Sequence, residues 1–292
     1  DKEIENQFMN DGGYIQYSFN YQRFALQIME FVLKISEITG IELSDQSKAL
    51  IEKSVLQMYQ LQDKTGDVPN YGSNDGALIF PVTTSNYRDF RPVLNAVHAV
   101  LKGKRLYNQG NYDEELLWFS DIDIRNIPYA DIQRKSISYG DSGFYSLRHN
   151  DGHLMIVLQD FKTRPAQMDQ MHIDLWHKGV NVLCDSGTYS YATDLGKQLA
   201  LTAAHNTVKI SDKEQMKKHG PFLIYDWTSA TEVEFDENHF RGTMKSKNGY
   251  SHTRVINKDS GGYSIEDHGL GDVENYEVLF HTPCEIEKMN VA

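Results

Sequence analysis

Along the first 118 residues, apolar side chains recur at intervals of three and four positions, which is the period of a helix packed on one side. Residues 21–38 show this period most clearly, and Gly40 then offers a helix C-cap. Their apolar stripe consists of Phe24, Ala25, Ile28, Phe31, Val32 and Ile35. Two further helices are predicted over residues 46–62 and 89–102. The sequence therefore predicts a helical domain over residues 1–118.

After about residue 122 the apolar period falls to two, which is typical of strands with one buried face. Twelve strands are predicted, at residues 132–139, 144–148, 154–158, 172–176, 181–184, 207–210, 222–226, 232–235, 239–244, 251–257, 263–268 and 277–282. Because no helical pattern intervenes, they predict a large antiparallel β-sandwich over residues 119–292. Residues 286–292 also have strand character. The predicted fold class is α+β, with helices first and the sandwich second.

A loop rich in Gly, Pro, Asn and Asp separates the second and third predicted helices. It has the sequence GDVPNYGSNDGALIFPV and covers residues 66–82. This is much longer than a minimal helix connection, and long loops are where binding and catalytic residues are often placed. We therefore expect this loop to contribute to a site.

The composition narrows the class of protein. The formal net charge is −12 and no basic run is present, which argues against a nucleic-acid partner. No apolar run reaches membrane-spanning length, so membrane insertion is not expected. The chain starts in helix-like sequence without Met or a signal peptide, as expected of a mature product or an excised piece. Cys184 and Cys284 are predicted to be buried thiols, with one disulfide as the open alternative.

Candidate chemistry is concentrated in residues 164–208. The segment opens with a polar cluster made of Arg164, Gln167, Asp169, His172 and Asp174. It then places Asp185 and His205 beside short apolar strands, where an Asp and a His suit a zinc site or a catalytic cluster. Ordinary structural roles explain these residues equally well, because Asp185 can form a turn and His172 can pair with a carboxylate. Their spacing also lacks the compactness of a metal-binding signature.

A second candidate site precedes the first long helix, in NDGGYIQYSFNYQR at residues 10–23. Tyr14, Tyr17 and Tyr21 lie three and four positions apart, so in a helix they share one face. An aromatic stripe packed against neighbouring helices accounts for the same spacing. The spacing by itself leaves both interpretations open.

These segments together resemble a known family. RPAQMDQMHIDLWHKGVNVLCDSGTYSYA, followed by AAHNTVKISDKEQM and FLIYDW, resembles the β-sandwich domain of heparinase II/III-like polysaccharide lyases. DGGYIQYSFNYQRFAL resembles the helix that carries the catalytic tyrosine in the (α/α) toroid of that family, and GSNDGA with the Pro of FPV resembles its next loop. The resemblance covers most of residues 7–230. It implies that residues 1–118 are the C-terminal part of a toroid.

The resemblance implies β-elimination on a uronic-acid-containing polysaccharide, in which the C5 proton is removed and the 4-linked sugar is expelled. That reaction needs a base near C5, an acid near the leaving oxygen and fixed donors for the enolate-like charge. Tyr21 matches the tyrosine of the family and would be the general base or acid. The implied catalytic residues are Tyr21, His172 and His205, and the implied substrate-binding residues are Arg23, Arg164, Gln167 and Asn206. Gln167, His172 and His205 are expected to line a cleft at the domain junction.

The resemblance also implies a structural zinc ion in the sandwich. Asp185 and His205 match two of the ligands that relatives use. Gln167 stands where relatives usually have histidine, and an amide is a poorer zinc ligand than imidazole. His172 is the candidate substitute, so zinc is the single implied cofactor and its ligand set is incomplete.

A second hypothesis follows from two departures from the family pattern, Gln167 and the Gln22 that replaces the His usually found after the tyrosine. It is a non-catalytic carbohydrate-binding or capsule-assembly protein with a degenerate lyase site. Both hypotheses expect an acidic polysaccharide as partner and favour a periplasmic or secreted location over the cytoplasm. The Asn and His donors that neutralise the substrate carboxylate in relatives lie upstream of the tyrosine helix. We therefore expect this chain alone to be inactive.

Overall fold

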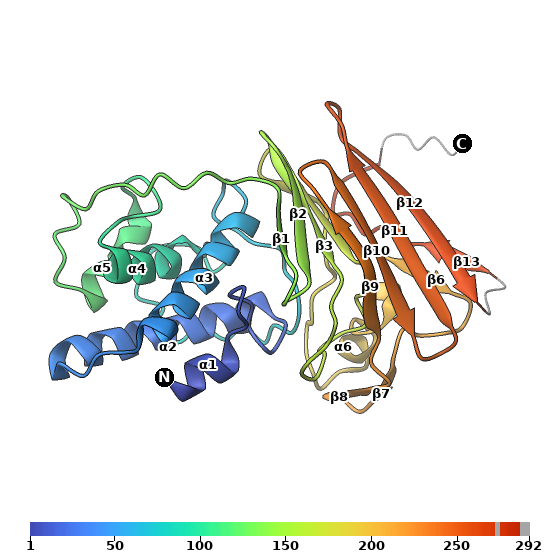
Figure 1. Ribbon diagram of the computed structural model, residues 1–292, viewed down its shortest axis with the longest axis horizontal. Helices are drawn as coiled ribbons and strands as arrows, with labels where there is room; N and C mark the ends of the chain where they lie inside the picture. Colours follow the sequence, from blue (N-terminus) through green and yellow to red (C-terminus); the bar gives the residue numbers. More distant parts are fainter. Residues whose placement is uncertain (272–274, 287–292) are drawn as a thin grey trace.

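The computed structural model describes residues 1–271 and 275–286. Helices gather at one end of the molecule and strands at the other (Figure 1). The α-helices of the first part are α1 (Lys2–Gln7), α2 (Phe19–Thr39), α3 (Asp45–Leu61), α4 (Arg91–Lys102) and α5 (Glu114–Phe119), with a short 3-10 turn, η1 (Asn111–Asp113). The three predicted long helices are therefore confirmed. No helix among the described residues has the length and apolar character needed to cross a bilayer.

The strands form two main antiparallel sheets. The first sheet has the order β1-β2-β3-β4-β5, with β1 (Ile137–Tyr139), β2 (Phe144–His149), β3 (Gly152–Val157), β4 (Ile173–His177) and β5 (Val180–Leu183). The second has the order β12-β11-β10-β9, with β9 (Ser229–Phe235), β10 (His239–Ser246), β11 (Tyr250–Lys258) and β12 (Tyr263–Gly271). Two small pairs join β6 (Val208–Ile210) to β13 (Tyr276–Val278) and β7 (Lys217–His219) to β8 (Leu223–Tyr225). The antiparallel sandwich is confirmed.

The first sheet is the middle layer of the molecule, because it is covered on both faces. On β3, Leu154 and Ile156 pack against Phe240 of the second sheet, within one apolar cluster. Met155 and Val157, which alternate with them, belong to the cluster formed with the helices. All six residues of β3 are buried for this reason, so neither face of the strand is exposed to solvent. The helices are thus packed directly on the sandwich.

Several details differ from the sequence predictions. A short helix, α6 (Asp194–Gln198), and a 3-10 turn, η2 (Thr202–Ala204), interrupt the strand region, and β7 was not predicted. The first helix, α1, was not predicted either. It has six residues and β7 has three, which is too few to show a periodic pattern. Both cysteines are free thiols, but Cys184 is half-buried and Cys284 is exposed, so the prediction of two buried thiols was wrong. Most of residues 286–292 lies outside the described residues.

Tyr14, Tyr17 and Tyr21 do not share a helix face, so the prediction that their spacing places them on one face was wrong. Helix α2 begins only at Phe19, with Ser18 as its N-cap, so Tyr14 and Tyr17 lie in the preceding turn. Tyr17 has a positive φ of 49°, which no helix accommodates, and its hydroxyl accepts a hydrogen bond from the Lys162 backbone. Of the three, Tyr21 alone is in the helix.

Candidate functional site

Tyr21 lies in the first turn of α2, and the local structure fixes its position. Its backbone N–H donates to the Ser18 hydroxyl at 3.1 Å, and that hydroxyl donates to the backbone carbonyl of Ser73 at 2.5 Å. The start of the helix is thereby tied to the long loop between α3 and α4. Gly72 permits the close approach, since its φ is 79° and a Cβ there would lie 2.1 Å from the Tyr17 carbonyl oxygen.

The Tyr21 hydroxyl meets a residue of the sandwich. Its oxygen lies 2.9 Å from the hydroxyl oxygen of Tyr191, which belongs to the GTYSY segment between β5 and α6. The Tyr191 ring stacks edge-on against Phe222 at 5.2 Å. Arg164 donates to the Phe222 carbonyl and lies 5.7 Å from its ring. Phe222 and Arg164 are exposed and both tyrosines are half-buried, so this Tyr21 cluster is open to solvent.

The Tyr21 hydroxyl holds its proton firmly. Burial raises its pKa well above the ordinary value of tyrosine, and the Tyr191 hydroxyl and the Asp75 carboxylate raise it further. Asp75 comes from the long loop, which confirms that this loop contributes to the surroundings of Tyr21. The resting phenol therefore carries its proton, and because a raised pKa makes it a weaker acid, proton transfer requires bound substrate to bring that pKa down.

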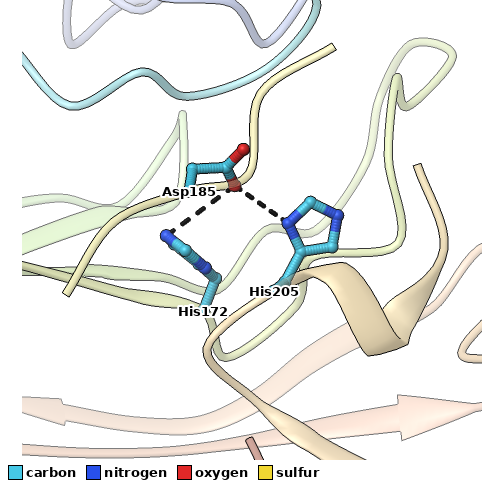
Figure 2. A group of neighbouring side chains, drawn as sticks. All are labelled: His172, Asp185 and His205. Atoms are coloured by element: carbon cyan, nitrogen blue, oxygen red, sulfur yellow. Dashed lines mark hydrogen bonds and ion pairs between the residues drawn. The ribbon is translucent and has the colours of Figure 1, made fainter. Parts of the chain in front are cut away.

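A second cluster lies inside the sandwich and consists of His172, Asp185 and His205 (Figure 2). Asp185 follows β5, His172 precedes β4, and His205 follows η2. The Asp185 Oδ2 atom lies 2.8 Å from Nδ1 of His205 and 3.8 Å from Nε2 of His172. All three side chains are fully buried, at 0% exposure. The sequence analysis singled out each of them, and the structure brings them together.

The charges in this His205 cluster are set by mutual contact. Burial alone would raise the pKa of Asp185, but the His205 and His172 imidazoles bring it below its ordinary value. For His205, burial lowers the pKa, yet the Asp185 carboxylate raises it overall. Burial and the neighbouring positive groups lower the pKa of His172 to about 3. The cluster is thus a buried His205–Asp185 ion pair beside a neutral His172.

The His205 cluster fits zinc in kind and spacing. Two imidazoles and a carboxylate are a donor set that zinc takes, and their nearest ligand atoms all lie within 4.8 Å of one another. Nε2 of His172 and Nε2 of His205 are buried without a hydrogen-bond partner. His172 is the weakest metal ligand of the three. Its Nδ1 accepts a hydrogen bond from the backbone N–H of Asn206, whereas the second nitrogen of a ligating histidine usually donates a hydrogen bond. Gln167 donates to the Gly187 carbonyl, two residues after Asp185.

The residues expected at a cleft between the domains are buried instead. Gln167, His172 and His205 are at most 3% exposed, so they do not line an open cleft, contrary to expectation. Gln167 borders a narrow cavity of about 20 Å³ beside Tyr191, and its Oε1 atom has no partner. Asn206 is also fully buried, where its amide donates to the carbonyls of Ile173 and Cys184. The Asp185 carboxylate offsets part of the cost of burying the two imidazoles in the sandwich interior.

The two residues of the tyrosine helix that the sequence analysis discussed beside Tyr21 are structural. Arg23 is 2% exposed, lies over the Tyr87 and Phe90 rings at 4.4 Å from each, and donates to Asn20. Gln22 donates to Ser54 and Gln57 of α3. Both therefore hold α2 against its neighbours and do not face Tyr191.

Tyr191, Asp75 and Phe222 were missed as site residues by the sequence analysis. The GTYSY and GSNDGA segments that contain the first two were recognised, so a signal existed. What the sequence did not provide was the contact between positions 21 and 191, which are 170 residues apart. That contact depends on the packing of α2 against the sandwich.

Comparison with known proteins defines the class to which this helix-and-sandwich chain belongs. The profile of the family described as heparinase II/III-like, C-terminal matches residues 131–291, more than half of the chain. A curated relative, heparin-sulfate lyase from Bacteroides thetaiotaomicron, is 23% identical over 97% of this chain. The chain belongs to the heparinase II/III-like family.

Solved structures show the same fold. Heparinase III, the BT4657 gene product, with methylated lysines, superimposes with a TM-score of 0.73 at 18% identity and covers 98% of this chain. A mutant of heparan sulfate lyase HepC from Pedobacter heparinus gives a TM-score of 0.65 at 18% identity over 92% of this chain. The chain spans 40–42% of the length of these relatives.

Proposed function

We propose that the protein is a polysaccharide lyase that cleaves a uronic-acid-containing polysaccharide by β-elimination. The observation that carries the proposal is the pair of hydroxyls of Tyr21 and Tyr191, which meet at 2.9 Å where helices and sandwich join. Family membership and the heparin- and heparan-cleaving relatives support the substrate class. The periplasmic or secreted location stays part of the proposal.

The proposal gives residues of this chain the following roles. A base of the full-length protein takes the C5 proton, the C4–C5 double bond forms as the C4–O bond breaks, and the Tyr21 hydroxyl gives its proton to the leaving oxygen while Tyr191 holds that hydroxyl in place. Proton exchange with solvent then restores the Tyr21 phenol and the free base. Arg164, exposed beside Phe222, is placed to pair with a substrate carboxylate. The His205 cluster is fully buried and acts by holding together the segments that carry Tyr191 and Gln167.

An ultraviolet assay of the full-length protein tests this proposal against the alternative of a carbohydrate-binding protein. β-Elimination creates an unsaturated uronate that absorbs in the ultraviolet, whereas binding does not. We expect absorbance to rise with at least one polymer in a panel of heparan-type, alginate-type and bacterial uronic-acid polysaccharides. Binding of a polymer without any absorbance change across the panel would establish the alternative.

We further propose that Asp185, His205 and His172 hold a structural zinc ion, which would link the segments after β5 and η2. Elemental analysis of the full-length protein should then find one zinc per chain. A chelator should lower the melting temperature, by about 2–4 °C for each kcal/mol of metal-dependent stability lost.

Asp185→Asn should abolish zinc binding, because an amide replaces the carboxylate that faces both imidazoles. Asp174→Asn is the matched control. Burial raises the pKa of Asp174 to about 8, so its carboxyl is already neutral near pH 7 and Asn resembles it closely. Equal zinc content in the two variants would remove Asp185 from the metal site.

A further inference from the structure

A large cavity lies away from both clusters. It has a volume of about 690 Å³ and opens between the C-terminal end of α3, residues 106–112 and the hairpin that joins β2 to β3. In Figure 1 this hairpin is at the upper edge of the molecule, whereas α6, β7 and β8 are at the lower edge. None of the residues that line it belongs to the Tyr21 or His205 clusters. We call it the upper cavity.

The lining of the upper cavity is rich in cations, although the chain has a net charge of −12. The cationic side chains are Lys64, Arg91, Arg134, Lys135 and Arg148, and the carboxylates are Asp63, Asp151 and Glu237. Arg91 is paired with Asp89 at 2.7 Å. Within the described part of the chain, Arg134 and Arg148 form no ion pair. Among the described residues, these two guanidinium groups in one wall of the cavity thus have no carboxylate within 4 Å, although Asp63 acts on Arg148 at longer range.

Contacts with the protein satisfy only part of these two side chains. Arg134 donates to Gln62 Oε1 at 2.9 Å, and Arg148 donates to the Gln60 carbonyl at 2.5 Å at the C-terminal end of α3. Those contacts stabilise the helix end, where positive charge is favourable. They leave Nε of Arg134 and Nε of Arg148 buried without an acceptor. Burial, and to a smaller extent the positive charge of Arg134, lower the pKa of Arg148 to about 10. An anion bound in the cavity would offset the repulsion between the two guanidinium groups.

Aromatic rings line the same cavity. Tyr129 is exposed at 53% and offers its ring to a ligand, whereas Tyr59, Tyr107 and Tyr112 are buried at 6–8% and support Arg134. Arg134 lies over the Tyr59 ring at 4.4 Å, and Tyr59, Tyr107 and Tyr112 follow one another with ring centroids 5.7 and 5.5 Å apart. Guanidinium groups recognise carboxylate and sulfate, and aromatic faces pack against the apolar faces of sugar rings. The volume also falls in the range of small-molecule sites. The lining therefore matches an acidic sugar in both charge and surface.

We propose that the upper cavity is a second binding site for an acidic oligosaccharide. Arg134 and Arg148 receive a sulfate or carboxylate group, the exposed Tyr129 ring packs on a sugar ring, and the exposed Lys64 and Lys135 attract the polymer at the rim. This site goes beyond the proposed lyase reaction, because it binds the polymer at a distance from Tyr21. Binding in the upper cavity does not depend on whether elimination takes place at Tyr21.

Hydrogen–deuterium exchange on the full-length protein tests this site. A Tyr21→Phe form prevents turnover, and a size-defined heparin oligosaccharide is the probe. We expect slower exchange in residues 132–136 and 148–152 when the probe is present. Lys64→Gln with Lys135→Gln should weaken this protection about three- to tenfold in probe concentration, because two rim charges are lost without disturbing a buried contact.

Lys245→Gln with Lys247→Gln is the matched control, since it removes the same charge from exposed positions outside the cavity and should leave the protection unchanged. Protection confined to the segments of Tyr21 and Tyr191 would overturn the proposal. So would equal protection by inorganic sulfate alone at the same concentration. Protection of the cavity with no ultraviolet product from the wild-type protein would support this site while refuting the lyase reaction.

Discussion

Tyr21→Phe in the full-length protein is expected to lower turnover of the uronic-acid polymer by about 10²- to 10⁴-fold, the usual contribution of a positioned proton donor. The substitution removes one oxygen, the one that lies 2.9 Å from Tyr191 and that the structure keeps protonated. The Ser18 hydroxyl accepts from the backbone N–H of residue 21 and donates to the Ser73 carbonyl, so neither contact uses the Tyr21 side chain and both are retained. Initial rates of ultraviolet absorbance and a far-ultraviolet circular dichroism spectrum provide the measurement.

Tyr14→Phe is the control for this experiment. The Tyr14 hydroxyl bonds to Gln7 in the turn before α2, so its removal deletes a phenol oxygen close in sequence and outside the Tyr21 cluster. We expect its turnover to stay within a few-fold of wild type. A Tyr21→Phe protein that turns over at the wild-type rate would exclude the hydroxyl from the reaction. A change in KM with unchanged kcat would make Tyr21 a binding residue only.

Arg254→Met is expected to reduce the free energy of unfolding by about 3–5 kcal/mol, because Asp267 loses its guanidinium partner and keeps only the His252 contact. Arg254 is fully buried on β11 and contacts Asp267 through Nε and Nη2 at 2.7 and 3.0 Å. Its Nη1 donates to the carbonyls of Met171 and Asn206, next to His172 and His205. One side chain thus links the second sheet to the His205 cluster. Urea or thermal unfolding gives the measurement.

The pH dependence of stability separates this ion pair from simple packing. Burial alone would raise the pKa of Asp267, but the His252 and Arg254 contacts bring it well below its ordinary value. A carboxyl with a depressed pKa in the folded state stabilises the fold above the pKa of the unfolded chain, about 3.9, and loses this contribution as the pH falls. The difference in stability between wild type and Arg254→Met should therefore shrink as the solution is acidified below that value.

Arg241→Met, on the neighbouring strand β10, is the control. The Arg241 side chain is 36% exposed and lies 3.4 Å from Glu232, so its loss should change stability by less than about 1 kcal/mol. If both variants unfold at the same denaturant concentration, the buried pair does not hold the two sheets together in the way that we propose.

The pattern of the sequence was sufficient for most of the fold. Long helices and strands repeat their period over many residues, so α2, α3, α4 and the two main sheets were predictable. Elements such as α6 and β7 are too short for that. The layering was not predictable either, because the full burial of β3 depends on helices that lie more than fifty residues before it in the chain.

The site was predictable in its parts and not in its arrangement. The sequence singled out His172, Asp185 and His205, but gave no sign that they would be fully buried in the sandwich. It singled out Tyr21 through a resemblance, and missed Tyr191 as its partner. Contacts between residues far apart in the chain follow from packing of the whole molecule, which local periodicity does not encode.

The most direct test of the central claim is the chemistry of the cleaved bond. The full-length protein should be incubated with its uronic-acid polymer in ¹⁸O-labelled water, and the products analysed by mass spectrometry and NMR. β-Elimination predicts a new non-reducing end with a C4–C5 double bond and no ¹⁸O introduced by the cleavage. A saturated non-reducing end together with ¹⁸O at the cleaved linkage would show hydrolysis and would contradict the proposed function.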